Sequence, residues 1–348
     1  MSTPTTETRT PLLSVRNLTT SFTTEFGVVD AVRGVSWDIY PGEVLGVVGE
    51  SGSGKSVTMG AVMGLVPTPP GIVTGDEILF EGRDLLTMPA KQMRAIRGRE
   101  IAMIFQDPMT SFNPVRTIGH QIAEAIRVHE KVSKKAAKAR VIELLQLVGV
   151  PSPSTRYSQY PHEYSGGMRQ RAMIAMAIVN RPKLLIADEP TTALDVTIQA
   201  QILDVLTSIR DETDAAMVLI THDLGLIAEM ADRVLVMYGG KTVETADVRA
   251  LFASPSHPYT VGLLESLPRI DAEVTSISSI PGQPPSLAYP PSGCYFHPRC
   301  SVSQGRSVCS TDEPELREFS AHLAHRSACH FPEEVADPVY LETGVVVR

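Results

Sequence analysis

The sequence contains no apolar run long enough to cross a bilayer as a helix, which takes about 20 residues. It also begins without the apolar stretch of a signal peptide, since residues 1–11 are polar and are expected to be disordered. With a net charge of −8, the chain lacks the overall positive charge typical of nucleic-acid-binding proteins. We therefore expect a cytoplasmic protein that, if it works at a membrane, is held there by partners.

Cysteine is scarce and unevenly placed. The only four are Cys294, Cys300, Cys309 and Cys329, all in the C-terminal part of the chain. In a reducing compartment this grouping favours a metal site over two disulfides. The closely spaced Cys-x2-Cys pairs of zinc ribbons are absent, and four thiolates could hold either tetrahedral zinc or a [4Fe–4S] cluster.

The 348 residues include 43% hydrophobic residues, enough for a sizeable core. Apolar patterning predicts strands at 12–18, 28–39, 43–48, 101–105, 184–187, 217–221 and 233–238, and helices at 54–65, within 117–149, at 166–180 and at 196–210. This order predicts an α/β fold with a mainly parallel, mixed sheet covered on both faces. Beyond residue 250 Pro, Ser and Cys accumulate, so we expect a main domain at 12–250 and a small extension at 251–348.

A glycine-rich turn lies between the predicted strand at 43–48 and the helix that follows. Residues 49–56 match the phosphate-loop pattern, in which backbone N–H groups and a helix N-terminus surround phosphate. The lysine can reach the β- and γ-phosphates and the last serine can bind Mg²⁺. The residues predicted to contact nucleotide here are Gly49, Glu50, Ser51, Gly52, Ser53, Gly54, Lys55, Ser56 and Val57.

Polar residues follow two other apolar strands. Asp188 and Glu189 come after the strand at 184–187, and His222 comes after the strand at 217–221. Ligands of α/β sheets bind at the carboxyl ends of the strands, so we expect these side chains beside the phosphate loop. Asp188 would hold Mg²⁺, Glu189 would orient or deprotonate the attacking water, and His222 would contact the γ-phosphate.

Together these motifs resemble the ATP-binding subunit of an ABC transporter over residues 12–250. The resemblance extends to Gln106 as a Mg²⁺-sensing glutamine, to Ala193–Asp195 as a loop that communicates across a dimer, and to Phe22, or less clearly Phe26, as an adenine-stacking ring. It implies a mixed sheet core with a helical subdomain at about 107–180, and ATP and Mg²⁺ as ligands.

The segment Ser165, Gly166 and Gly167 resembles the signature of the same family. The resemblance implies that this helix start closes over ATP held by a second, similar subunit, so that each site needs two chains. The usual signature continues Gly-Gly-Gln, whereas here Met168 follows the two glycines, a departure that need not disable the hydroxyl and N–H groups of the signature.

The C-terminal part resembles the extension of ATPase subunits of peptide and nickel importers, through Pro-Ser-His-Pro-Tyr-Thr at 255–260 and Gly-Cys-Tyr-Phe-His-Pro-Arg-Cys at 293–300. This branch implies a [4Fe–4S] cluster on the four cysteines, with zinc as the alternative. Because four cysteines already complete a site, we expect His297 and His330 to face solvent rather than to be ligands. The same branch implies uptake of di- or oligopeptides, a paralogous ATPase partner, two transmembrane permease subunits, an external binding protein, and a peripheral place on the cytoplasmic face of the inner membrane.

Three other functions are considered. A nickel or other small-solute importer would share every motif. A soluble ABC ATPase of DNA repair or translation typically has coiled-coil insertions or two ATPase domains, and this acidic chain has neither. A nucleotide-binding scaffold without hydrolysis is disfavoured because Glu189 and His222 are both present.

Overall fold

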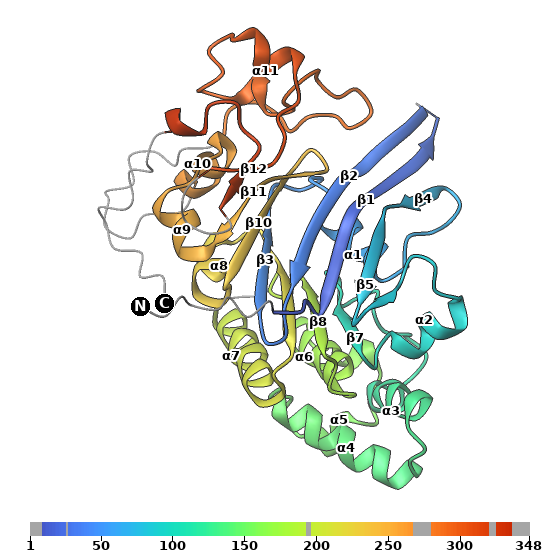
Figure 1. Cartoon of the computed structure of the whole chain (residues 1–348). Coiled ribbons are helices and arrows are strands. Elements are labelled where there is room, and N and C mark those ends of the chain that lie inside the picture. Colours follow the sequence, from blue (N-terminus) through green and yellow to red (C-terminus); the bar gives the residue numbers. More distant parts are fainter. Residues whose placement is uncertain (1–8, 26, 193–195, 267–279, 320–324, 336–348) are drawn as a thin grey trace, which may run out of the picture.

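The computed structural model describes residues 9–25, 27–192, 196–266, 280–319 and 325–335 (Figure 1). Its centre is a mixed sheet of eight strands, with parallel pairing from β10 through β3, β9 and β8 to β7 and antiparallel pairing beyond β10. In spatial order the strands are β12 (Arg317–Glu318), β13 (Arg326–Ser327), β11 (Lys241–Asp247), β10 (Arg233–Tyr238), β3 (Val44–Val48), β9 (Ala216–Ile220), β8 (Leu184–Asp188) and β7 (Ile101–Ile104).

A second, antiparallel sheet packs against one face of the first. Its strands are β2 (Gly27–Ile39), β1 (Leu13–Thr24), β5 (Glu77–Phe80) and β6 (Arg83–Asp84) in spatial order, with β4 (Gly71–Thr74) paired to the far end of β1. The long β1–β2 ribbon crosses the view in blue in Figure 1. The fold thus has the mixed α/β architecture that the sequence predicted.

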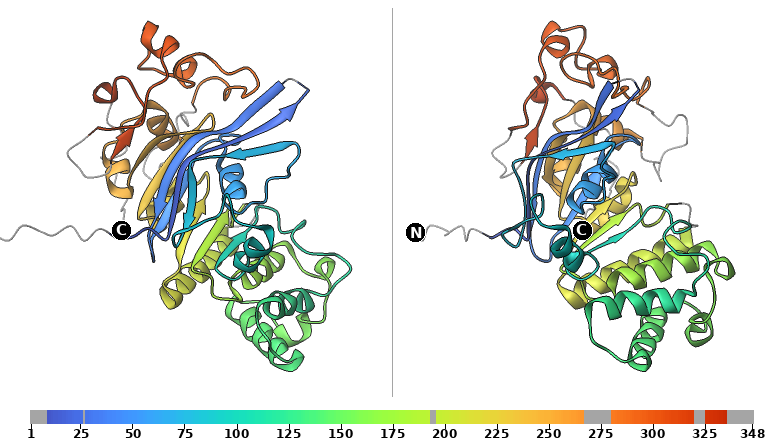
Figure 2. Two further views of the ribbon diagram at one scale, coloured as in Figure 1. Left: turned by 45° about the vertical axis from the view of Figure 1, so that its right-hand side comes forward. Right: turned by 90° about the vertical axis from the view of Figure 1, so that its right-hand side faces the viewer.

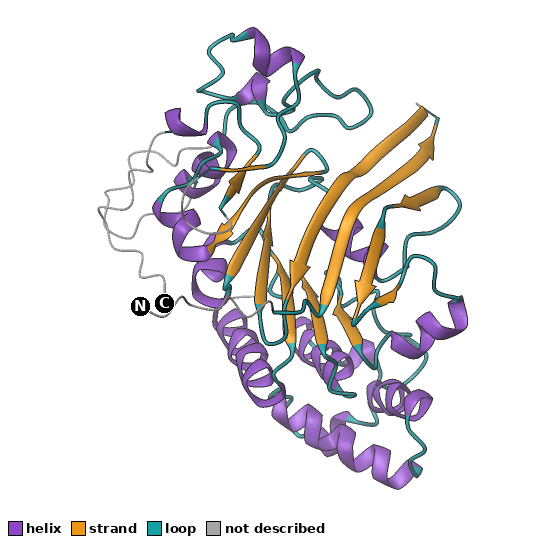
Figure 3. Ribbon diagram, in the orientation of Figure 1, coloured by secondary structure: helices purple, strands orange, loops and turns teal. Residues whose placement is uncertain are grey.

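Helices complete the structure (Figure 3). Along the chain they are α1 (Lys55–Val62), α2 (Ala90–Ile96), α3 (Ile118–His129), α4 (Lys134–Leu147), α5 (Pro153–Arg156), α6 (Gly166–Ile178), α7 (Val196–Thr213), α8 (Leu224–Met230), α9 (Val248–Ala253), α10 (Pro258–Glu265) and α11 (Ser307–Thr311), with short 3-10 turns η1 (Pro161–Glu163), η2 (His297–Arg299) and η3 (Pro332–Glu334).

The main sheet is buried on both faces, as a central parallel sheet should be. In β9 the alternation is clear, because Val218 joins a core shared with the second sheet, α1 and α2, whereas Met217 and Leu219 join a larger core under the helices. Every residue of β3, β8 and β9 is buried. These strands therefore give firm support to the loops that follow their carboxyl ends.

The predicted helical region at 117–149 is two helices. Ser133 begins the second one, since its hydroxyl accepts a hydrogen bond from Ala136 N at 3.1 Å. The two turned views of Figure 2 place α3 and α4 at the opposite end of the molecule from the orange C-terminal segment. That segment joins the main sheet through β13, which pairs with β11.

Candidate functional site: a phosphate loop and three strand ends

The phosphate loop connects β3 to α1 and has a backbone that glycine permits. Gly49, Gly52 and Gly54 have φ angles of 149°, 79° and 102°. A Cβ on Gly49 would lie 2.2 Å from the Met237 carbonyl oxygen, and one on Gly54 would lie 2.6 Å from the Ala31 carbonyl oxygen. The loop is therefore closely packed against the core, and Gly54 precedes α1 without a capping side chain, so the first N–H groups of the helix stay available.

Lys55 lies inside this loop. Its side chain is buried, and its Nζ donates hydrogen bonds to Gly49 O at 2.6 Å and Glu50 O at 3.0 Å. Burial lowers the pKa of Lys55, and the carboxylates of Glu189, Asp188 and Glu50 oppose that shift. An ammonium that here satisfies loop carbonyls can instead donate to phosphate oxygens. Ser51 and Gly52 are exposed, Ser53 is buried, and Val57 packs against the core below α1.

Ser56 and Asp188 connect α1 to the end of β8. The Ser56 hydroxyl lies 3.0 Å from Asp188 Oδ1. Burial raises the pKa of Asp188, while the hydrogen bond from Ser56 lowers it. A hydroxyl and a carboxylate oxygen are ligands that Mg²⁺ accepts, and both lie beside the phosphate loop, so the pair fits the predicted metal ion in kind.

Glu189 is the centre of a second group of polar residues, formed where β7, β8 and β9 end. Its carboxylate accepts hydrogen bonds from Gln106 Nε2 at 2.9 Å and Thr192 Oγ1 at 2.8 Å, and its Oε1 lies 3.6 Å from His222 Nδ1. Its φ angle is +47°, a left-handed conformation that is uncommon outside glycine and that clusters at functional sites. The structure therefore brings Gln106, Glu189 and His222 together. His222 is 65% exposed and so is open to a ligand.

The signature-like segment begins α6. Ser165 caps this helix through a hydrogen bond from Met168 N to its hydroxyl at 3.3 Å, and Ser165 and Gly166 are exposed while Gly167 is half-buried. The Met168 side chain packs against the larger core. The unusual residue thus serves packing below the helix start and leaves the exposed positions unchanged.

Two predicted aromatic residues and one predicted segment have different outcomes. Phe22 lies half-buried in β1, where it pairs with Val29 of β2 and Gly71 of β4. Phe26 and the segment Ala193–Asp195 lie outside the described residues.

Two contacts near Glu189 were not predicted. Thr192 adds a hydrogen bond to the carboxylate, and the buried Gln170 donates from Nε2 to Pro190 O at 2.6 Å. The second contact joins α6 to the residue after Glu189. The sequence shows Gln170 just after the signature-like segment, but it gives no sign that Gln170 contacts Pro190.

The four cysteines line one small cavity, together with Phe296, His297 and His330. None of the four forms a disulfide in the described part of the chain. Burial raises the pKa of each, to about 11 for Cys294 and about 12 for Cys329. Four thiols on one cavity fit a thiolate-bound group in kind and number, although the described residues contain no group of three or more ligands arranged around a single metal ion.

The expectation that His297 and His330 face solvent is wrong. Both are half-buried, and each hydrogen-bonds a backbone carbonyl, His297 that of Cys294 and His330 that of Asp312, both at 2.9 Å. The cause is the tight folding of the segment, in which backbone carbonyls left outside regular structure take side-chain donors.

The fold and this set of strand ends define an ABC-type nucleotide-binding cassette. The structure resembles the solved dimeric structure of a bacterial ABC transporter cassette with a TM-score of 0.62 at 23% identity, covering 68% of this chain and 99% of that one. The "ABC transporter" family model matches residues 32–192, and the model "Oligopeptide/dipeptide transporter, C-terminal region" matches residues 243–309.

Two relatives from Bacillus subtilis are each 55% identical to the chain. They are the dipeptide transport ATP-binding protein DppD, matched over 83% of this chain and 86% of the relative, and the oligopeptide transport ATP-binding protein OppD, matched over 89% and 87%. The chain belongs to the dipeptide/oligopeptide family of ABC transporter ATP-binding proteins, and it is an ABC transporter ATPase. Among the helices that the structure describes, none is both long and apolar enough to span a bilayer.

Proposed function

We propose that this chain hydrolyses ATP to power the import of dipeptides or oligopeptides. The observation that carries the hydrolytic part is the grouping of Gln106, Glu189 and His222 at three adjacent strand ends beside the phosphate loop. The peptide substrate is supported by the names of the relatives and by the C-terminal family match.

We propose a role for each residue of this site. Backbone N–H groups of residues 51–56 would surround the phosphates, and Lys55 would exchange its loop carbonyls for phosphate oxygens. Ser56, Asp188 and Gln106 would hold Mg²⁺, which when bound neutralises phosphate charge. Phe22 would stack on adenine.

Glu189 would accept a proton from the attacking water, and His222 would donate a hydrogen bond to the terminal phosphate. Gln106 and Thr192 hold the Glu189 carboxylate in place, so the base is oriented before the water arrives. The oriented Glu189 carboxylate and the uncapped N-terminus of α1 would thus accelerate hydrolysis mainly by holding the water and the phosphates in the right positions.

The exposed start of α6 supports a two-chain site. Ser165 and Gly166 present a hydroxyl and N–H groups to the outside, and we propose that, with Gly167, they contact ATP held by a second ATPase, a paralogue of this chain. Two transmembrane permease subunits would complete the complex on the cytoplasmic face of the inner membrane, and an external binding protein would supply the peptide.

The transport assignment predicts which solute stimulates hydrolysis. In the complete complex, reconstituted in vesicles, we expect the ATPase rate to rise when the binding protein is added with peptide, and to stay at its basal level with the unloaded protein. Nickel chelates added in place of peptide serve as the comparison. Stimulation by the chelate alone would reassign the cargo, and failure of the chain to associate with any permease would contradict an importer.

We also propose that Cys294, Cys300, Cys309 and Cys329 hold a [4Fe–4S] cluster with a structural role. Their place on one cavity and the sequence pattern around Cys294 and Cys300 support it. Cysteines bind such a group as thiolates, so assembly would release their protons. Such a group can stabilise a segment with little core of its own.

The cluster assignment predicts a brown protein after anaerobic purification, with about four irons per chain and a broad visible absorption band. Cys300→Ser is expected to lose most of the iron, and Ser301→Ala is the matched control that keeps it. Stoichiometric zinc in a colourless protein would contradict the cluster and support the alternative metal.

A further inference from the structure

The second residue of the phosphate loop, Glu50, is held through its backbone N–H, its carbonyl and its side chain. Its N–H donates to Tyr259 Oη at 2.7 Å, and its carbonyl accepts from Lys55 Nζ at 3.0 Å. Its carboxylate receives two hydrogen bonds from Arg299, at 2.6 and 3.0 Å. Two of these partners, Tyr259 and Arg299, lie in the C-terminal segment, more than two hundred residues away along the chain.

Both partners are built into the protein rather than lying on its surface. The Arg299 side chain is 5% exposed, and it also donates to Pro281 O at 2.8 Å and to Tyr238 Oη at 3.3 Å. Hydrogen bonding to Glu50 raises the pKa of Arg299. A buried, two-pronged arginine–carboxylate pair fixes both distance and orientation. Tyr259 is fully buried and packs against Tyr238 and Phe296.

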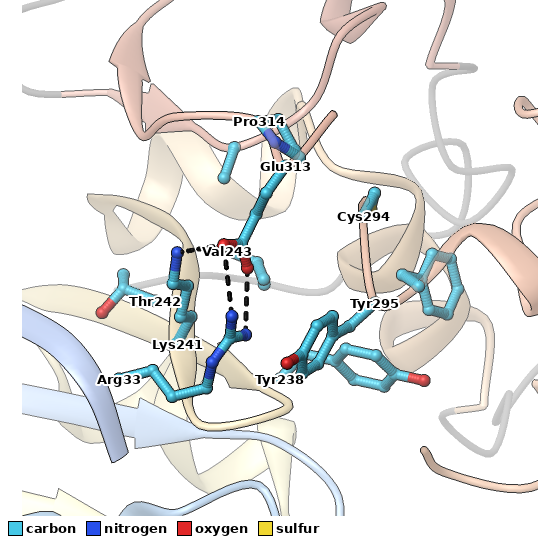
Figure 4. A pocket seen from close by; sticks show the side chains of 11 residues that line it. Arg33, Tyr238, Lys241, Thr242, Val243, Cys294, Tyr295, Glu313 and Pro314 are labelled. Carbon is cyan, nitrogen blue, oxygen red and sulfur yellow. Dashed lines mark hydrogen bonds and ion pairs between the residues drawn. The ribbon is translucent and has the colours of Figure 1, made fainter. Parts of the chain in front are cut away.

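A second connection lies close by (Figure 4). Glu313 pairs with Arg33 of β2 at 2.9 Å and with Lys241 of β11 at 2.7 Å, and the Arg33 guanidinium lies 3.9 Å from the centre of the Tyr295 ring. The side chains in the figure point toward one another from three separate parts of the chain. The C-terminal segment is therefore attached to the antiparallel sheet through Arg33 and to the main sheet through Lys241.

These anchoring residues are close to the cysteines in the sequence. Tyr295 follows Cys294, and Arg299 precedes Cys300. An arrangement that holds the four thiols on one cavity therefore also holds the backbone from which Arg299 reaches the loop. Neither Arg299 nor Tyr259 has a role in the proposed hydrolysis itself.

We propose that Arg299 and Tyr259 are positioning residues of the nucleotide site, through which the C-terminal segment fixes the entry of the phosphate loop and neutralises Glu50. The inference rests on the proposed use of this loop for ATP. Two physical effects support it. A loop already held in its bound shape loses less freedom on binding. A Glu50 carboxylate without its arginine would add negative charge beside the phosphates.

The sharpest test is Tyr259→Phe, which keeps the buried ring and removes only the acceptor of Glu50 N–H. We expect the full-length variant to bind ATP about fivefold more weakly, as the loss of one hydrogen bond implies. Calorimetry of MgATP binding measures this, and thermal unfolding checks the fold. Tyr289→Phe, at a tyrosine that is 72% exposed in the same segment, is the matched control and should bind like wild type.

A second set of variants tests the charge pair. Arg299→Gln should weaken ATP binding about tenfold or more, because a charge-assisted pair is lost and Glu50 is left unneutralised. Glu50→Gln should cost less, since the remaining arginine favours phosphate. The double variant should bind ATP more tightly than Arg299→Gln alone, because it carries no unneutralised carboxylate at position 50, so the two losses should not add. Arg326→Gln, in an exposed ion pair, is the control.

The results distinguish a failure of the positioning role of Arg299 and Tyr259 from a failure of the proposed ATP site. Wild-type affinity in folded Tyr259→Phe and Arg299→Gln, or simple additivity in the double variant, overturns the positioning role while leaving ATP binding intact. A wild-type chain that binds no MgATP overturns the proposed nucleotide site and this inference with it.

Discussion

Glu189→Gln is expected to lower ATP hydrolysis by about 10²- to 10⁴-fold, the range by which a positioned general base accelerates proton transfer. Glutamine keeps the shape of the side chain and can still meet Gln106 and Thr192, so the local structure should survive. ATP binding should be nearly unchanged, because the side-chain hydrogen bonds that the structure describes for Glu189 are to Gln106 and Thr192 and not to residues 49–56. Phosphate release by the assembled complex and MgATP binding by the chain measure the two effects separately.

The variant should also accumulate as a dimer closed around ATP, visible as a larger species in size-exclusion chromatography. Glu212→Gln, at an exposed glutamate of α7, is the matched control and should hydrolyse at the wild-type rate. Normal turnover by Glu189→Gln would remove Glu189 from the role of base and would direct attention to Asp188 or His222.

Lys55→Ala should differ from Glu189→Gln, because it should lose ATP binding itself. The ammonium is the one side-chain cation inside the loop among the residues described, and alanine leaves the phosphates without a charge-assisted donor. We expect the affinity for MgATP to fall by about 100-fold or more, as two to three kcal/mol would imply. The gain from removing a buried charge should offset part of any loss of stability.

Calorimetry with MgATP measures this loss, and Lys91→Ala, at an exposed lysine of α2, is the control that should bind normally. If Lys55→Ala binds ATP as tightly as wild type, the phosphate-loop interpretation fails. The two variants together distinguish a site that cannot bind from one that binds and cannot react.

The sequence predicted those parts of the site that follow parallel strands. Asp188, Glu189 and His222 could be placed because consecutive parallel strands deliver their next residues to one edge of the sheet. The phosphate loop could be placed because its glycines and lysine have a fixed order. Helix and strand bounds near these motifs were close, as at β10, where the predicted 233–238 matches Arg233–Tyr238.

Contacts between distant segments could not be predicted. The bonds of Glu50 to Tyr259 and Arg299 span 209 and 249 positions, and no local pattern encodes such a meeting. The short strands β4, β5 and β6 were also missed, since two to four residues carry little alternation. The split between α3 and α4 was missed because one capping serine, Ser133, decides it within a continuous helical pattern.

The pairing of β13 with β11 has a consequence for self-association. Without it β11, seven residues long, would end the main sheet with unpaired N–H and C=O groups that another chain could extend. β13 covers the middle of that edge, at Glu244 and Thr245, and the sheet then ends in β12. β12 and β13 have two residues each and carry the exposed Arg317, Glu318 and Arg326. A short, charged edge disfavours strand-by-strand growth, so we expect the segment that reaches the phosphate loop also to disfavour self-association at this part of the sheet.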